Sequence, residues 1–180
     1  VVKGMPLYDP RTGTTAYSEN AALAIAAWLN NARFGRGVPY AEIYGPALEA
    51  AANICDEDVT LANGSTEKRF TCNGVLKADT PFVDNLEKIL SASLGRAMMI
   101  GGDWVIEAAA WKEPEFPPFE LKDFREGFSV QTLMPKSVAF NAVKGAFRNP
   151  ARLWQKDDFP AITSAAYQAE DGGDREFKDV

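Results

Sequence analysis

The most informative absence in this sequence is histidine, which does not occur once in its 180 residues. Without histidine there is no Ser-His-Asp or Cys-His catalytic set, and zinc loses its usual nitrogen ligand. The commonest general base at neutral pH is missing as well. An enzyme built on this chain would therefore have to work with carboxylates, lysine or tyrosine.

Cysteine is nearly as scarce, since only Cys55 and Cys72 are present. Two cysteines are too few for a disulfide framework, and neither lies in a Cys-x-x-Cys motif that would indicate a redox or zinc site. A free cysteine usually behaves as a small buried side chain. The sequence thus predicts two buried, reduced thiols.

Positive charge is also in deficit, because 19 Lys and Arg stand against 25 Asp and Glu and leave a net charge of −6. Binding to phosphate backbones needs a basic face, so we expect no sequence-specific nucleic acid partner.

No apolar run approaches the roughly 18 residues of a membrane-spanning helix, so we expect no such segment. The start of the chain does not resemble a signal peptide. The first and last residues have the pattern of the interior of a strand, which predicts that the sequence is a piece of a longer chain.

Three segments have the apolar spacing of amphipathic helices: 18–35, 45–57 and 79–95. Ser18 or Asn20 is expected to cap the first. Pro46 fits the first turn of the second, and Thr80 followed by Pro81 fits the start of the third. We expect Gly35 and Gly95 to end the first and third helices. The inner face of the second is predicted to hold Leu48, Ala51, Ala52 and Cys55, and a shared core to hold Trp28, Phe70, Leu86, Ile89 and Leu90.

The remaining patterns indicate strands and loops. Residues 1–8, 68–76, 127–133 and 140–147 are predicted strands, and 96–110 is a predicted hairpin that turns at Gly101-Gly102. A turn is expected at 8–13, an irregular segment at 149–160 and an extended one at 161–173. The order of elements predicts an α+β fold with mixed or antiparallel strands, three main helices and a β-rich C-terminal part.

The proline-rich segment 112–121, "KEPEFPPFEL", is the best boundary candidate, because proline continues neither a helix nor a ladder. The expected organisation is an α+β domain over 1–112 and a β-rich segment over 119–180. We expect the second domain to be completed by chain beyond Val180.

Two local patterns resemble ligand sites but depart from them. Acids at the first, third and twelfth positions of 56–67 match a calcium hand, but Leu61 stands where that loop needs glycine. The "GRG" of 35–37 lies between two predicted helices, whereas a phosphate-binding loop follows a strand. A solvated loop and a flexible turn are the expected structures. We predict no catalytic, cofactor-binding or metal-binding residues.

Arginines near aromatic side chains are the remaining feature: Arg33 and Arg36 in one region, Arg148 and Arg152 beside Trp154 in another. Arginine and tryptophan are enriched in protein interfaces. An exposed arginine also packs its stem on a core aromatic side chain without any partner. From the residues alone, both interpretations stand.

Four segments, taken in order, resemble the tail-tip attachment protein J family of long-tailed (lambda-like) phages. They are "GMPLYDPRTGTTAYSENAALAIAAWL", "ARFGRG", "KRFTCNGVLKADTPFVDNLEKILSASLGRAMMIGGDWVI" and "FNAVKGAFRNPARLW". The resemblance covers nearly the whole chain, and the shared order is more specific than any one segment. "RAMMIGGDW" departs from the family's usual glycine-rich, arginine-containing hairpin.

The resemblance implies the hub portion of a structural tail protein and no enzyme. Three copies of the full-length protein would close a ring at the distal end of the tail tube, contact the distal-tail and tape-measure proteins and open for DNA passage. The protein would be made in the bacterial cytoplasm and lie at the virion tail tip. On this interpretation Arg148, Arg152 and Trp154 are interface residues.

Two other functions remain open on the sequence. One is a tail-associated cell-wall glycosidase that works with carboxylates, the chemistry that the missing histidine leaves available. The other is a receptor-binding module.

Overall fold

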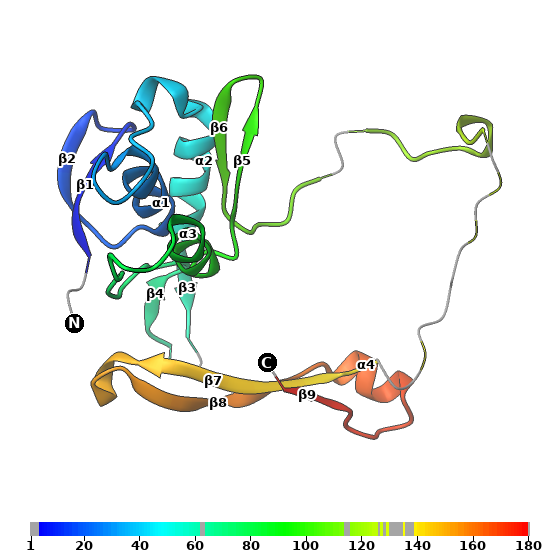
Figure 1. Cartoon of the computed structure of the whole chain (residues 1–180). Coiled ribbons are helices and arrows are strands. Elements are labelled where there is room, and N and C mark those ends of the chain that lie inside the picture. The colour runs from blue at the N-terminus through cyan, green and yellow to red at the C-terminus, as the bar shows by residue number, and fades with distance from the viewer. Residues whose placement is uncertain are drawn as a thin grey trace. The chain divides into compact units, whose positions relative to one another are not determined.

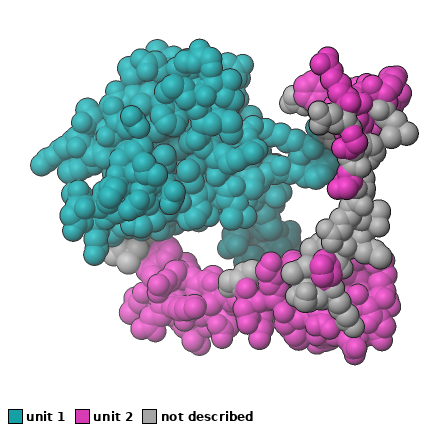
Figure 2. All heavy atoms as spheres, turned by 45° about the vertical axis from the view of Figure 1, so that its right-hand side comes forward, with its two compact units in different colours: residues 1–115 teal, residues 116–180 magenta. Residues whose placement is uncertain are grey.

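The structure is a computed structural model, and it describes residues 4–61, 64–113, 116–125, 127, 129, 135 and 139–179 (Figure 1). These residues form four α-helices and nine strands in small sheets, so the predicted α+β class is confirmed. The chain divides into two compact units, residues 1–115 and 116–180, called unit 1 and unit 2 (Figure 2). No helix of the described part is long and apolar enough to cross a membrane.

Unit 1 begins with an antiparallel hairpin of β1 (Met5–Asp9) and β2 (Thr14–Ser18). The turn predicted at 8–13 is confirmed, and Gly13 adopts a left-handed φ of 67° there. The second strand was missed, because 14–17 carried no clear pattern. Segment 18–35 was expected to be helical after a cap at Ser18 or Asn20.

Helix α1 (Ala21–Asn30) is capped as predicted by Asn20, whose side chain accepts the Leu23 N–H at 3.2 Å. It ends at Asn30, so the prediction that it continues to Gly35 is wrong. The side-chain oxygen of Asn31 accepts the N–H groups of Arg33 and Phe34, each at 2.9 Å. Asparagine thus offers the backbone an alternative to the next helical turn.

Helix α2 (Gly45–Cys55) follows a short 3₁₀ turn, η1 (Tyr40–Glu42), and has Pro46 in its first turn, as predicted. All four residues predicted for its inner face are buried. Helix α3 (Phe82–Ser91) begins after Pro81 without a side-chain cap, so the prediction of a Thr80 cap is wrong. Its Asn85 instead donates to the Lys77 carbonyl at 2.9 Å and holds the preceding segment.

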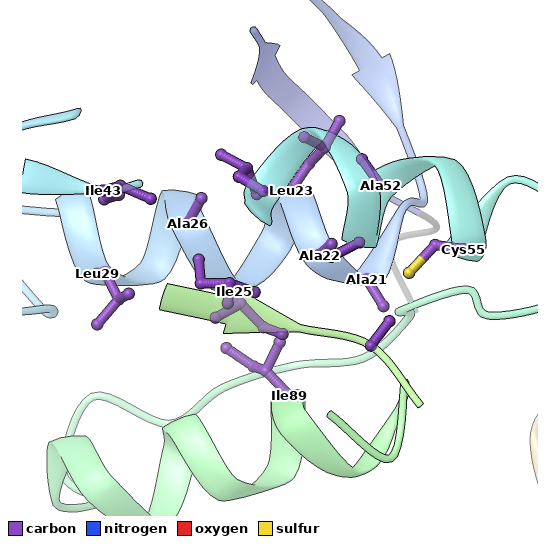
Figure 3. Close-up of a cluster of buried hydrophobic side chains, with 14 of the residues drawn as sticks. Ala21, Ala22, Leu23, Ile25, Ala26, Leu29, Ile43, Ala52, Cys55 and Ile89 are labelled. Atoms are coloured by element: carbon purple, nitrogen blue, oxygen red, sulfur yellow. The ribbon is translucent and has the colours of Figure 1, made fainter. Parts of the chain in front are cut away.

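The core of unit 1 surrounds α1, which contacts β1, α2, α3 and β6. Figure 3 shows Ile89 of α3 pointing toward Ile25 of α1, with Ala52 and Cys55 of α2 beside the start of α1. Of the five residues predicted to share this core, Leu86 and Ile89 are buried. The other three, Trp28, Phe70 and Leu90, are only partly buried and pack against its edge.

Two hairpins complete unit 1. The glycine-turned pair β5 (Arg96–Ile100) and β6 (Asp103–Glu107) is confirmed, with φ of 64° at Gly101 and 102° at Gly102. Segment 56–67 was expected to be a loop, but it contains the short strands β3 (Asp58–Thr60) and β4 (Thr66–Lys68). Residues 69–76 form no strand beyond a single bridge between Asn20 and Thr71, so that prediction is wrong.

Unit 2 holds a three-stranded sheet in the order β8-β7-β9, with the 3₁₀ turns η2 (Leu121–Asp123) and η3 (Pro150–Arg152). Strand β7 (Ala142–Asn149) lies antiparallel to β8 (Gln155–Thr163) and parallel to β9 (Phe177–Asp179). Most of β8 was predicted to be irregular, and α4 (Ala165–Glu170) was predicted to be extended, so both predictions are wrong. The strand predicted at 127–133 lies largely outside the described residues.

Candidate assembly surface

The β7–β8 hairpin turns through residues 150–154, and the side chain of Asn149 organises this turn. Its oxygen accepts the Ala151 N–H at 2.9 Å, and its amide donates to Asp157 Oδ2 at 2.8 Å. The Asn149 carbonyl also accepts the Trp154 N–H at 2.9 Å. One residue therefore bonds both to the start of the turn and to the returning strand.

The turn contains two consecutive non-glycine residues in the left-handed region, Leu153 with φ 54° and Trp154 with φ 64°. Such conformations cost free energy and tend to occur at functional sites. Leu153 is 85% exposed, so burial within this chain does not offset the cost. This geometry makes the hairpin end a candidate contact site.

The three interface residues predicted from sequence all lie at this end of the hairpin. Arg152 Nη1 lies 3.4 Å from Asp157 Oδ1, and Trp154 is partly buried. Arg148 is exposed and stands opposite Lys156, one position along from the Phe147–Asp157 pair. Because neighbouring residues on a strand point to opposite faces, Arg148 lies on the other face from the Asp157 that Arg152 contacts.

The face that carries Asp157 is apolar along the rest of the hairpin. Val143 stands opposite Ile162, and Phe147 and Phe159 follow on the same face across a β-bulge. Phe147 is 44% exposed and Ile162 67% exposed. The only buried residues in the described part of unit 2 are Asn141 and Ala142. This sheet face is therefore open, which is typical of surfaces that bind another protein.

The arginines of unit 1 behave differently. Arg33 lies over the ring of Phe34 at 5.0 Å, and Arg36 lies over the ring of Phe82 at 5.7 Å. Arg36 therefore packs on a ring at the edge of the core, as the second interpretation predicted, whereas Arg33 lies over the exposed ring of its neighbour Phe34.

Two of the three acids that resembled a calcium hand, Asp56 and Asp58, are engaged in ion pairs. Asp56 accepts a hydrogen bond from Arg11 Nη2 at 2.8 Å, and Asp58 accepts one from Lys68 Nζ at 2.8 Å. Arg11 also contacts Asp9 at 2.7 Å, which lowers the pKa of the Asp9 carboxyl below its ordinary value. Within the described part of the chain, no three Cys, Asp or Glu side chains are grouped so as to hold a metal ion.

Unit 1 also contains a hollow of about 420 Å³ between β1, α1, α3 and the segment 72–76. Its walls are mainly apolar, with Leu7, Trp28 and Ile89 among them, and its lining includes no carboxylate. Burial raises the pKa of the Cys72 thiol on its wall. A smaller hollow of about 270 Å³ is lined by Glu19 and Asp56.

Sequence reasoning missed the residues that give the hairpin surface its form. Asn149 and Asp157 were both predicted to lie in the irregular segment 149–160. The alternation of Val143 and Phe147 in "FNAVKGAF" was the available signal for an open apolar face. The exposure of Ile162 had no such signal, because the first six residues of β8 were predicted to be irregular and the rest extended without an assigned partner strand.

A scan against models of known protein families finds no match to this chain, and a search of curated proteins finds none either.

Proposed function

We propose that this chain is part of the hub at the tip of a phage or prophage tail, where it acts by assembly and performs no catalysis. In the full-length protein three copies would form a ring that closes the tail tube. The distal-tail and tape-measure proteins would be its neighbours. The protein would be made in the bacterial cytoplasm and end up at the virion tail tip.

The observation that carries the proposal is the open β7–β8 hairpin. It presents Phe147 and Ile162 on one sheet face and a strained, exposed Leu153 at its end. A subunit of a ring needs a surface that is incomplete until a neighbour covers it. The ordered resemblance of four segments to a tail-tip family supports the same function from the sequence side.

Replacement of Arg152 and Trp154 by alanine in the full-length protein tests the proposal. Arg152 has only a 3.4 Å contact with Asp157, and its side chain is 67% exposed, so the chain should still fold. Loss of the two side chains should block tail assembly, because Arg and Trp dominate interface energetics. The readout is the yield of complete tails by electron microscopy after complementation of a deletion.

A matched control changes Trp111 and Lys112 to alanine. Trp111 is 80% exposed and the Lys112 side chain 60% exposed, so this pair has similar chemistry in unit 1. Tails of this variant should assemble normally. If the Arg152/Trp154 variant also assembles normally and the chain clears peptidoglycan, the structural function is wrong. If it assembles without such activity, the choice of contact residues is wrong.

A further inference from the structure

Two positive charges face each other on the side of the β7–β8 hairpin opposite to the apolar face that carries Phe147. Arg148 and Lys156 are direct partners in the antiparallel register, and both are exposed. Like charges in directly opposed positions destabilise a sheet. Neither takes part in an ion pair of the described residues. Within the described chain no ion pair compensates this repulsion, and an anionic partner would relieve it.

The same region is basic in sequence, although the chain as a whole carries a net charge of −6. No Asp or Glu occurs from Gly127 to Lys156. Lys144 shares the face of Arg148 but is already engaged with Asp179 at 3.3 Å. Arg148 and Lys156 are therefore the free cations of this face. The segment 127–156 carries five positive charges: Lys136, Lys144, Arg148, Arg152 and Lys156.

A complementary pair of negative charges lies on α3. Asp84 and Glu87 are three residues apart, so they are neighbours on one face of the helix, about 5–6 Å apart at Cβ. Both are exposed and outside every ion pair of the described residues, and Val83 beside them is 54% exposed. In the described part of unit 1, no other helix or strand carries two carboxylates without an ion-pair partner.

The spacing of the two pairs matches. Directly opposed residues of an antiparallel pair have Cβ atoms about 4.5–5.5 Å apart, close to the separation expected for Asp84 and Glu87. We propose that the Arg148–Lys156 face of one copy binds the Asp84–Glu87 face of α3 in a second copy. The contact is heterologous, and the step from this contact to a closed ring rests on the proposed tail-hub function.

Carboxylates fit this face better than a phosphate backbone does. Asp158, opposite Ala146, lies on the same face as Arg148, and so does Asp179 beside Lys144. These acids limit the positive stretch to two free cations, whereas nucleic acid binding gains affinity with each phosphate neutralised. A contact in which two cations meet two carboxylates on a helix does not require a more extended basic surface.

The test is a charge exchange between copies of the 180-residue chain. One variant carries Arg148→Glu and Lys156→Glu, and the other carries Asp84→Lys and Glu87→Lys. Sedimentation equilibrium measures association at about 0.02 M and about 0.5 M salt, because exposed ion pairs weaken as the Debye length falls. Circular dichroism of each variant reports whether it folds.

The wild-type chain should associate at low salt and dissociate at high salt. Each variant alone should lose at least about tenfold in association constant, since like charges then meet. An equimolar mixture of the two variants should associate again, because every contact in an alternating assembly is then between opposite charges. A control with Glu42→Lys and Glu49→Lys, which changes other exposed acids of unit 1, should not restore association when mixed with the Arg148/Lys156 variant.

Several outcomes would overturn the inference. They are no association of the wild-type chain, variants that associate like the wild type, or a folded mixture that fails to associate. Binding of a DNA oligonucleotide that the Arg148/Lys156 variant loses, with no recovery of association on mixing, would assign the face to nucleic acid instead. Recovery in a protein that is absent from tails would uphold the contact and reject the tail-hub function. A protein that is present at tail tips but does not recover association on mixing would uphold the tail-hub function and reject the contact.

Discussion

Asn149 and Asp157 lie diagonally on adjacent strands at the end of the β7–β8 hairpin, joined by a 2.8 Å hydrogen bond from the amide of Asn149 to the carboxylate of Asp157. The same Asn149 side chain accepts the Ala151 N–H at the start of the turn. The proposed contact residues Arg152 and Trp154 lie in the chain between Ala151 and Asp157, the two residues that Asn149 binds. Their positions therefore depend on Asn149, which is not itself one of the proposed contact residues.

Asn149→Ala should destabilise the hairpin by roughly 1–2 kcal/mol, because it removes one bond to a charged group and one turn bond. Hydrogen exchange at the amides of Ala151 and Trp154 should become faster. Gln155→Ala is the matched control, since Gln155 is exposed and stands opposite Asn149 in the register. Equal exchange rates in the two variants would show that Asn149 does not hold the turn.

Leu86→Ala should lower the free energy of unfolding of unit 1 by roughly 2–5 kcal/mol. Leu86 is 8% exposed and belongs to the core around α1. Val83→Ala on the same helix should change stability by no more than about 0.5 kcal/mol, because Val83 is 54% exposed. Urea titration of both variants measures the difference, and a Leu86 loss as small as that of Val83 would remove Leu86 from the core.

Gly35→Ala should destabilise the turn after α1 by at least about 1–3 kcal/mol. A Cβ at this position would lie 1.9 Å from the Trp28 carbonyl oxygen and 2.7 Å from that of Asn31, so backbone would have to move. Gly74→Ala serves as the control, because a Cβ there meets nothing within 4 Å. Thermal melts of the two variants compare the costs. A tolerated Gly35→Ala would mean that the chain does not pass this close to Trp28.

The Arg11–Asp9 contact predicts a pH dependence of stability. The hydrogen bond from Arg11 lowers the pKa of Asp9, so the folded state binds its proton less readily than the unfolded state. The stabilisation is therefore present above about pH 4, the ordinary range of an aspartate, and is lost as pH falls through the lowered pKa. Arg11→Met should be less stable at neutral pH and lose less stability on acidification. Urea titration at several pH values measures the free energy of unfolding of the variant and the wild type. If the two vary with pH in parallel, the Arg11–Asp9 contact is not the origin of the pH dependence.

Several elements were predictable because their sequence signals are local. The proline and apolar spacing of α2 and the paired glycines between β5 and β6 each determine structure within a few residues. Strand β8 was missed because it contains Pro160 and a run of charges, both of which an edge strand tolerates. The parallel pairing of β9 with β7 joins segments more than 30 residues apart, and no local pattern indicates it.

The candidate surface was predictable only in its location. Arginine and tryptophan near an Asn-Pro turn indicated the hairpin end, but the division of Arg148 and Arg152 between two faces depends on the register with β8. Segment 69–74 illustrates the same limit in unit 1. Phe70 and Cys72 are partly buried, as their alternation predicted, yet among the described residues this segment pairs only through the single bridge between Asn20 and Thr71.

The central claim, that the chain belongs to the tip of a tail, is tested most directly by immunogold electron microscopy. Antibodies raised against the 180-residue chain are applied to particles released from cells that carry the gene and from cells in which it is deleted. Label confined to the distal end of the tails, with incomplete tails in the deletion strain, is the predicted result. Normal, unlabelled tails in both strains would contradict the account.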